Sequence, residues 1–465
     1  MNQPRPTFVP DPDTLLPALG TTGSDPAALD TLVAHQRGTR LLLLRGLLDS
    51  VRTAPAGSLP EGAAERTLRD WRLLEAAERA DPAAARRIVH YPLTGAWAER
   101  TLRALNRRDR TPAAADLPHL GALAAAAAAR AGLRFTAEVP VTDGVLTLPT
   151  LGGHHVPKDQ AATARVEGDG DRLLLRLAAP GDGRGYGDVD TVEVHRGHDG
   201  IWRSPAPGWR PLRALHSAHG RPVLIDDVDP YRDEERRTNP YGLDATDELT
   251  TDEHARWRAA WREAQPWLRL GDGSRAREVD ALLDCFVPLA GGTGAQCSAT
   301  RGEAFGALLS STPHGGLELA ATLVHELQHT KLLALSQLTV LHTADGTPRY
   351  WAPWRTDSRP FEGLFQGAFA HLALADFHLR LALTLTSPAR RDTAWADHCR
   401  CRQQVEAALP QLLGSRALTP QGRTLVNAMA AHHTRLKEHA PPDDHLARAA
   451  AYVETTRVIW RRQRA

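Results

Sequence analysis

The sequence lacks a surplus of charge of either sign, and it lacks any long apolar run. Of its 465 residues, 56 are Lys or Arg and 55 are Asp or Glu, which gives a net charge of +1. Proteins that bind nucleic acid or anionic membranes usually carry a basic surplus. No apolar stretch approaches the ~18 residues of a membrane span, and residues 1–12 contain no signal-like apolar core. We therefore expect a cytoplasmic protein without nucleic-acid or membrane partners.

Cysteine is also scarce. The chain has four, and their spacing is too irregular for a disulfide framework or a paired zinc knuckle. We expect reduced thiols at all four positions, which are Cys285, Cys297, Cys399 and Cys401.

The composition that remains is that of an ordinary globular protein, with 42% apolar and 24% charged residues. Apolar residues recur with helical spacing between residues 27 and 130, and again beyond residue 247. The predicted fold class is therefore α+β and mainly helical. It comprises a helical N-terminal region (1–132), a β-rich module (133–228) and a helical region (229–465) that carries the motif described below.

The β-rich module is predicted from short, partly alternating stretches separated by turn residues. The glycine-containing segments 168–170 and 198–200 lie where hairpin turns need positive φ angles, which indicates a small antiparallel sheet. The predicted strands are 144–148, 163–167, 172–177 and 190–195.

The most informative segment is Leu317–Leu338, because it contains an H-E-x-x-H motif formed by His325, Glu326 and His329. Two histidines four residues apart lie on one face of a helix and can direct imidazole nitrogens at a single divalent metal. Glu326 lies about 100° around the helix from His325, so it can reach a metal-bound water or a neighbouring ligand.

Chance alone would produce this pattern in roughly one chain in twenty of this length and composition. The context strengthens it, because leucine, alanine and valine surround almost the whole helix and predict burial on most sides. An unpaired carboxylate there would be costly, or would become neutral through a shifted pKa. A metal with its ligands is the simplest explanation for these buried polar groups.

A second helix, predicted over residues 359–379, offers the further ligand. Glu362 and Gln366 share one face, and His371 lies on nearly the opposite side. The small residues of this helix, Gly363 and Gly367 among them, would allow a close approach to the H-E-x-x-H helix. Spacing leaves two choices open. Glu362 would give a gluzincin-type zinc peptidase, and His371 a three-histidine site or a facial arrangement completed by a carboxylate.

Several segments together resemble the bacterial HEXXH-motif domain proteins of peptide-modification clusters. The specific motifs are LVHELQHTKLLALSQL (323–338), YWAPWR (350–355) and R-P-x-x-G-x-x-Q-G-x-x-A-H (359–371), preceded by VPL (287–289) and residues 298–307. HYPLTGAWAERTLRAL (90–105) resembles the start of the same domain, so the likeness covers most of the chain.

The resemblance implies a non-haem Fe(II) enzyme that uses 2-oxoglutarate and O2 to hydroxylate a side-chain Cβ of a ribosomally synthesised precursor peptide. The family's Ala-His pair matches Ala370-His371, so the resemblance favours His371 as the further metal ligand, with Glu362 second and Gln366 lining the site. Glu326 would fix a histidine or act as a ligand itself.

The distal carboxylate of 2-oxoglutarate needs a planar bidentate cation. Arg359 is the preferred candidate, followed by Arg355 and by Lys331. The alternative is that these arginines form ordinary salt bridges with Asp357 or Glu362.

Two other functions remain open. A zinc metallopeptidase would use Glu326 as general base, and a catalytically silent peptide-binding component would use the metal only to support its fold. His398–Cys401 is a weaker metal candidate, expected instead to be a helix surface. His154-His155 in a predicted turn, Trp351 and Trp354 are candidate peptide contacts. The sequence does not indicate an oligomeric state.

Overall fold

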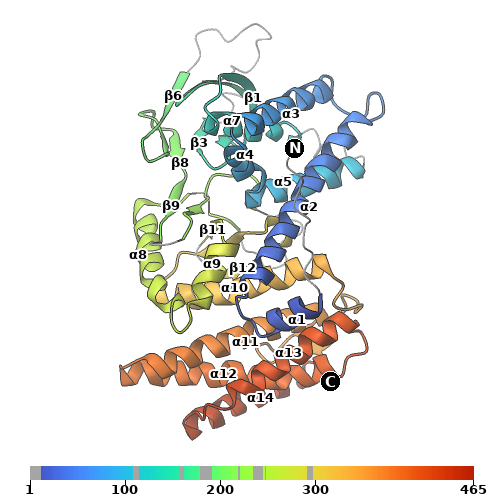
Figure 1. Cartoon of the computed structure of the whole chain (residues 1–465), viewed down its shortest axis with the longest axis vertical. Helices are drawn as coiled ribbons and strands as arrows, with labels where there is room; N and C mark the ends of the chain where they lie inside the picture. Colours follow the sequence, from blue (N-terminus) through green and yellow to red (C-terminus); the bar gives the residue numbers. More distant parts are fainter. Residues whose placement is uncertain are drawn as a thin grey trace.

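The computed structural model describes residues 12–107, 115–156, 162–177, 191–217, 220–233, 244–246, 248–290 and 297–464. Over these ranges the fold is α+β and mainly helical, as the sequence predicts, with a β-rich middle region (Figure 1). None of the described helices is long and apolar enough to cross a membrane. All four cysteines are free thiols, which confirms the prediction from their spacing.

The N-terminal region consists of helices that begin where the sequence supplies capping residues. Asp25 accepts a hydrogen bond from the backbone N–H of Ala28, and Asp81 caps a later helix in the same way. Each helix predicted here is confirmed. The helices are α1 (Pro12–Gly20), α2 (Pro26–Arg52), α3 (Ala63–Ala80), α4 (Pro82–Val89), α5 (Pro92–Asn106) and α7 (His119–Arg130).

Helix α7 can pack closely on the sheet because its side chains are small. Its alanines, from Ala122 to Ala129, are almost completely buried. A Cβ at Gly121 would lie 2.3 Å from the carbonyl oxygen of Glu138 on strand β1 (Phe135–Thr142). The lack of bulk therefore allows this helix to lie directly on the sheet.

The first sheet has eight strands in the order β7-β6-β5-β4-β1-β2-β3-β8, all antiparallel. Gly170 (φ 63°) and Gly200 (φ 77°) occupy the two predicted turns, which confirms them. The predicted strands are present, although Asp190, the first residue of one, lies outside the described residues. The remaining strands are β2 (Val145–Leu148), β3 (Gly152–His155), β4 (Thr163–Asp169), β5 (Arg172–Leu177), β6 (Thr191–Arg196), β7 (Trp202–Arg203) and β8 (Trp209–Pro211).

A second sheet was missed by the sequence analysis, which expected only helices beyond residue 247. Its order is β12-β13-β11-β10-β9, with β10, β11 and β13 parallel. Every residue of β11 and β13 is buried, so neither strand shows the polar alternation that marks a strand. This sheet joins strands from both sides of residue 228. Its strands are β9 (Arg213–Leu215), β10 (Val223–Ile225), β11 (Cys285–Leu289), β12 (Ser298–Ala299) and β13 (Ala307–Ser311).

The C-terminal helices form a layer at one end of the molecule, and α10 lies between this layer and the strands (Figure 1). Helix α10 packs against α8 on one side and α11 on the other, which explains its nearly uniform apolar surface. The helices are α8 (Thr251–Leu268), α9 (Ser274–Leu282), α10 (Gly316–Leu338), α11 (Phe361–Thr384), α12 (Pro388–Leu413), α13 (Pro420–Leu436) and α14 (Asp443–Arg462).

Candidate metal centre

The two motif histidines converge on α10. The Nε2 atoms of His325 and His329 are 3.0 Å apart, and the rings meet edge to face with centroids 4.7 Å apart. Nitrogens bonded at ~2.1 Å to one ion, with an angle of roughly 90–110° between the bonds, lie ~3.0–3.4 Å from each other. Together with Glu326, these residues form a group whose ligand atoms all lie within 4.8 Å of one another.

A chain of hydrogen bonds behind His329 fixes its ring. Its Nδ1 is 3.1 Å from the amide oxygen of Gln366, whose nitrogen donates to Glu362 over 2.8 Å. Glu362 in turn pairs with Nε2 of His342. Because the Gln366 oxygen accepts from Nδ1–H, the Nε2 atom of His329 carries the lone pair that a metal needs.

His371 on α11 faces the same group from the neighbouring helix. Its Nδ1–H donates to the carbonyl oxygen of Gly367 over 2.8 Å, which leaves Nε2 as the free nitrogen. Its ring is edge to face with His325 at 5.5 Å and stacks on Trp354 at 4.5 Å. His371 thus lies against His325 but outside the group of ligand atoms that are within 4.8 Å of one another.

Burial keeps these imidazoles neutral. It lowers the pKa of His325 to about 4, with a further contribution from His329. It lowers the pKa of His371 to about 3, assisted by His325. At neutral pH both rings therefore have an unprotonated nitrogen, as metal ligands must.

Glu326 is held by hydroxyl groups from the β12 segment. One carboxylate oxygen accepts from Oγ of Ser298 and the other from Oγ1 of Thr300, each over 2.7 Å, and the residue is only 3% exposed. Each oxygen retains a further lone pair. Two imidazoles and one carboxylate form the donor set of non-haem iron sites and also of His2Glu zinc sites, so the residues fit a divalent transition metal.

The structure separates the two candidates for the further ligand. Glu362 is bound to Gln366 and His342, on the side of His329 that faces away from Nε2. His371 is in ring contact with His325. Glu362 therefore contacts the centre through Gln366, whereas the His371 ring lies directly against His325.

The glycines of α11 have a different role from the one expected. A Cβ at Gly367 would lie 2.0 Å from the Trp354 ring, and a Cβ at Gly363 would lie 3.3 Å from Nε of Arg359. They make room for these side chains rather than for α10. Trp354 can consequently lie flat against His371.

The predicted anchors for a co-substrate are engaged elsewhere. Arg355 pairs with Asp357 at 2.7 Å, and Arg359 lies 3.7 Å from the same carboxylate. Lys331 is buried and donates to Glu278 over 2.6 Å and to two backbone carbonyls. The salt-bridge alternative therefore describes both arginines in this structure.

Sequence reasoning overlooked Arg400 on α12. Its positive charge contributes to the lowered pKa of His371, after burial and His325, so it lies within electrostatic range of the cluster. It pairs with Asp397 at 2.9 Å and remains half exposed. Nothing in the local sequence distinguishes Arg400 from other helical arginines, because only the packing of α12 on α11 brings it near.

The weaker candidates lie mostly in the core. His398, Cys399 and Cys401 are buried, so the prediction of a helix surface was wrong, and Nδ1 of His398 bonds to the Ala375 carbonyl. His154 is buried on strand β3 rather than exposed in a turn.

Two comparisons with known proteins were negative: no family model matches the chain, and no curated protein matches it.

Proposed function

We propose that this protein is an Fe(II)- and 2-oxoglutarate-dependent hydroxylase of a ribosomally synthesised peptide, acting at a side-chain Cβ. The observation that carries the proposal is the 3.0 Å separation of the His325 and His329 Nε2 atoms beside a buried carboxylate. Bound iron would supply the activation of dioxygen, which a redox-inert zinc ion cannot. The motifs shared with the HEXXH-motif peptide-modification proteins supply the reaction type.

The reaction balances without another reductant. One oxygen atom of O2 enters the C–H bond as hydroxyl, and the other enters succinate as 2-oxoglutarate loses CO2. Two electrons come from the keto acid and two from the C–H bond.

In this proposal the chain's own residues hold the metal-binding side chains and orient them. Gln366 and Gly367 bond to the Nδ1 atoms of His329 and His371, so that the Nε2 atoms would be available to hold the metal. Ser298 and Thr300 hold Glu326, and Trp354 covers one face of His371. Arg359, Arg355 and Arg400 are the candidates for the distal carboxylate of 2-oxoglutarate. The first two would have to leave Asp357, and Arg400 would have to leave Asp397.

The zinc peptidase remains the alternative. Its general base would be Glu326, whose two oxygens already accept hydroxyl protons from the β12 segment. That arrangement favours a positioning or ligand role for this carboxylate over proton transfer from a water.

Anaerobic reconstitution with Fe(II), 2-oxoglutarate and the peptide encoded beside the gene, followed by exposure to air, tests the proposal. We expect the peptide to gain one oxygen atom with stoichiometric release of succinate, measured by mass spectrometry. Cleavage of the peptide would show the peptidase instead. An unchanged peptide that remains bound would show a silent binding component.

A further inference from the structure

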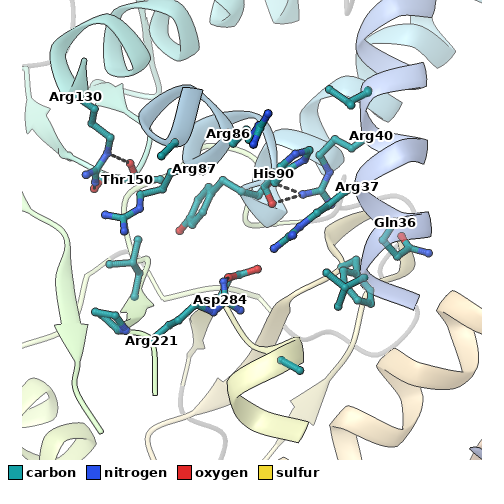
Figure 2. A pocket seen from close by; sticks show the side chains of 18 residues that line it. Gln36, Arg37, Arg40, Arg86, Arg87, His90, Arg130, Thr150, Arg221 and Asp284 are labelled. Carbon is teal, nitrogen blue, oxygen red and sulfur yellow. Dashed lines mark hydrogen bonds and ion pairs between the residues drawn. The ribbon is translucent and has the colours of Figure 1, made fainter. Parts of the chain in front are cut away.

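A second polar site lies away from the histidine centre. It is a cavity of about 650 Å³ between α2, α4, the end of α7 and the strands of the second sheet (Figure 2). That volume is within the range of ligand pockets. Six arginines line it, and Asp284 is the one acidic side chain among its lining residues. The arginines are Arg37, Arg40, Arg86, Arg87, Arg130 and Arg221.

Two of these arginines are held in place by hydrogen bonds to the residues that line the cavity. Arg40 is 6% exposed and donates to the backbone carbonyls of His90 and Tyr91, both over 2.7 Å. Arg130 donates to the hydroxyl and carbonyl oxygens of Thr150, both over 2.8 Å. Neither contact supplies a negative charge, and Asp284 is the acidic side chain that acts on Arg40.

Three others have no partner. In the part of the chain that the structure describes, the guanidinium groups of Arg37, Arg86 and Arg87 make no hydrogen bond or ion pair. Asp284 is already paired with Arg221 at 2.8 Å. Burial and then the charges of Arg37, Arg40 and Arg86 lower the pKa of His90 to about 4. The cavity is thus strongly cationic although the whole chain is almost neutral.

The form of the cavity favours carboxylates spread along a chain over a compact phosphate. Helix α4 lines the cavity with Ala83, Arg86 and Arg87. The N–H groups of Ala83 and Ala84 at its N-terminus already donate to Asp81, so they are not free to bind a phosphate. Apolar side chains alternate with the cations. Val33 and Leu41 share one face of α2 with Arg37, and Leu41 is 53% exposed.

The cavity is close to the histidine centre along the chain. Thr300 holds Glu326, and Phe305, five residues later, lines the cavity. Five residues span at most ~18 Å when fully extended. A bound peptide of about six extended residues could therefore reach from one site to the other.

We propose that this arginine-lined cavity binds an acidic, Asp- or Glu-containing segment of the same peptide whose side chain enters the histidine centre. The inference rests on the proposed function for the identity of the peptide. Guanidinium groups bind carboxylates in a planar, bidentate manner, and the exposed arginines can reorient to do so.

The test uses the full-length, metal-free protein and a fluorescein-labelled octapeptide with four glutamates among apolar residues. The reference probe replaces each glutamate by glutamine. Fluorescence anisotropy should show at least tenfold tighter binding of the acidic probe, weakening as salt is raised. Equal binding of the two probes would overturn the proposal.

The variant Arg86→Glu/Arg87→Glu reverses two charges that make no contact needed for folding. Its matched control is Arg390→Glu/Arg391→Glu, an exposed arginine pair near the start of α12. We expect the first to weaken binding of the acidic probe at least tenfold and the second less than twofold. Equal effects would place the binding elsewhere. Arg37→Ala, a single exposed change on another helix, should weaken binding severalfold.

A phosphate-containing ligand is the alternative occupant of the cavity, and inorganic pyrophosphate is the probe for it. If it binds at micromolar concentration and the acidic probe does not, the cavity is a phosphate site and the proposal is wrong. Because the binding assay contains no metal, failure of the hydroxylation reaction does not affect it. Conversely, hydroxylation with an unchanged KM in Arg86→Glu/Arg87→Glu would reject the peptide anchor and leave the proposed reaction intact.

Discussion

Two polar clusters in contact with α10 and α11 differ in their charge: a buried ion cluster, to which α9 also contributes, and the partly buried histidine centre. The ion cluster contains Arg275, Glu278, Lys331 and Asp376, joined by salt bridges of 2.6–3.1 Å. Asp376 also pairs with Arg380, which is bound to Asp272, so three basic and three acidic side chains balance one another. The histidine centre, a turn away on α10, instead leaves the Nε2 atoms of two imidazole rings facing one another.

The difference separates a structural role from a functional one. Burial opposes the ionised form of Glu278, but Arg275 and Lys331 outweigh it and lower the pKa of Glu278. The charges of that cluster are therefore balanced within the protein, although Arg275 Nε makes no hydrogen bond among the described residues. The imidazoles of His325 and His371 avoid charge by remaining neutral, and they have coordinating capacity left over. Spare ligand capacity in a buried place is what a metal site requires.

Glu278→Ala should produce the largest effect on folding. It leaves Arg275 and Lys331 buried without their shared partner, which costs about 3–5 kcal/mol. Urea unfolding monitored by circular dichroism measures this loss. Glu454→Ala, which removes an exposed ion pair with Arg457, is the control and should change stability by less than about 1 kcal/mol. A near-neutral Glu278→Ala would show that the cluster is not structural.

His329→Ala should lower metal affinity strongly and folding stability only slightly, the reverse of what we expect for Glu278→Ala. It removes one of two nitrogens that converge on the metal, so we expect iron affinity to fall at least ~100-fold, more than the loss of a hydrogen-bond partner would cause. Anaerobic equilibrium dialysis with Fe(II) measures it, and the unfolding free energy of the metal-free protein should change much less than in Glu278→Ala. His433→Ala, which removes a buried histidine of α13 that bonds to the Arg402 carbonyl, is the matched control. Unchanged iron affinity in His329→Ala would contradict the proposed metal centre.

Gln366→Leu tests whether the orientation of the His329 ring affects metal affinity. It keeps the size of the side chain but removes the acceptor for His329 Nδ1–H and the donor to Glu362. Loss of such a partner lowers metal affinity by ~10–100-fold. Iron dialysis should place this variant between the wild type and His329→Ala. If His371→Ala loses much more iron affinity than Glu362→Ala, the histidine is the further ligand. A larger loss in Glu362→Ala would assign the glutamate instead.

The ion cluster also predicts a pH dependence. Burial lowers the pKa of Lys331 to about 8 despite the pull of Glu278, whereas the unfolded chain has an ordinary lysine pKa near 10.5. Between these values the unfolded state binds more protons, so the contribution of Lys331 to stability rises with pH, by up to ~1.4 kcal/mol per pH unit. Unfolding titrations from pH 7.5 to 10 should show this rise in the wild type and a smaller one in Lys331→Met.

The local features of the fold were predictable because short-range patterns encode them. The apolar spacing of the N-terminal helices and the glycines at residues 170 and 200 correspond to observed helices and turns. The second sheet was not predictable in the same way. Its central strands β11 and β13 are buried on both faces, and a fully apolar run of five residues carries no period.

The same distinction between local and tertiary information applies to the candidate site. The sequence by itself determined the pairing of His325 with His329, because a spacing of four residues within one helix fixes their common face. Only the tertiary structure decided that His371 contacts them, that Glu362 acts through Gln366, and that Arg355 and Arg359 pair with Asp357. Tertiary packing also gathered arginines from α2, α4 and α7 around one cavity. Contacts between helices depend on how whole surfaces pack, and no spacing within one segment records that.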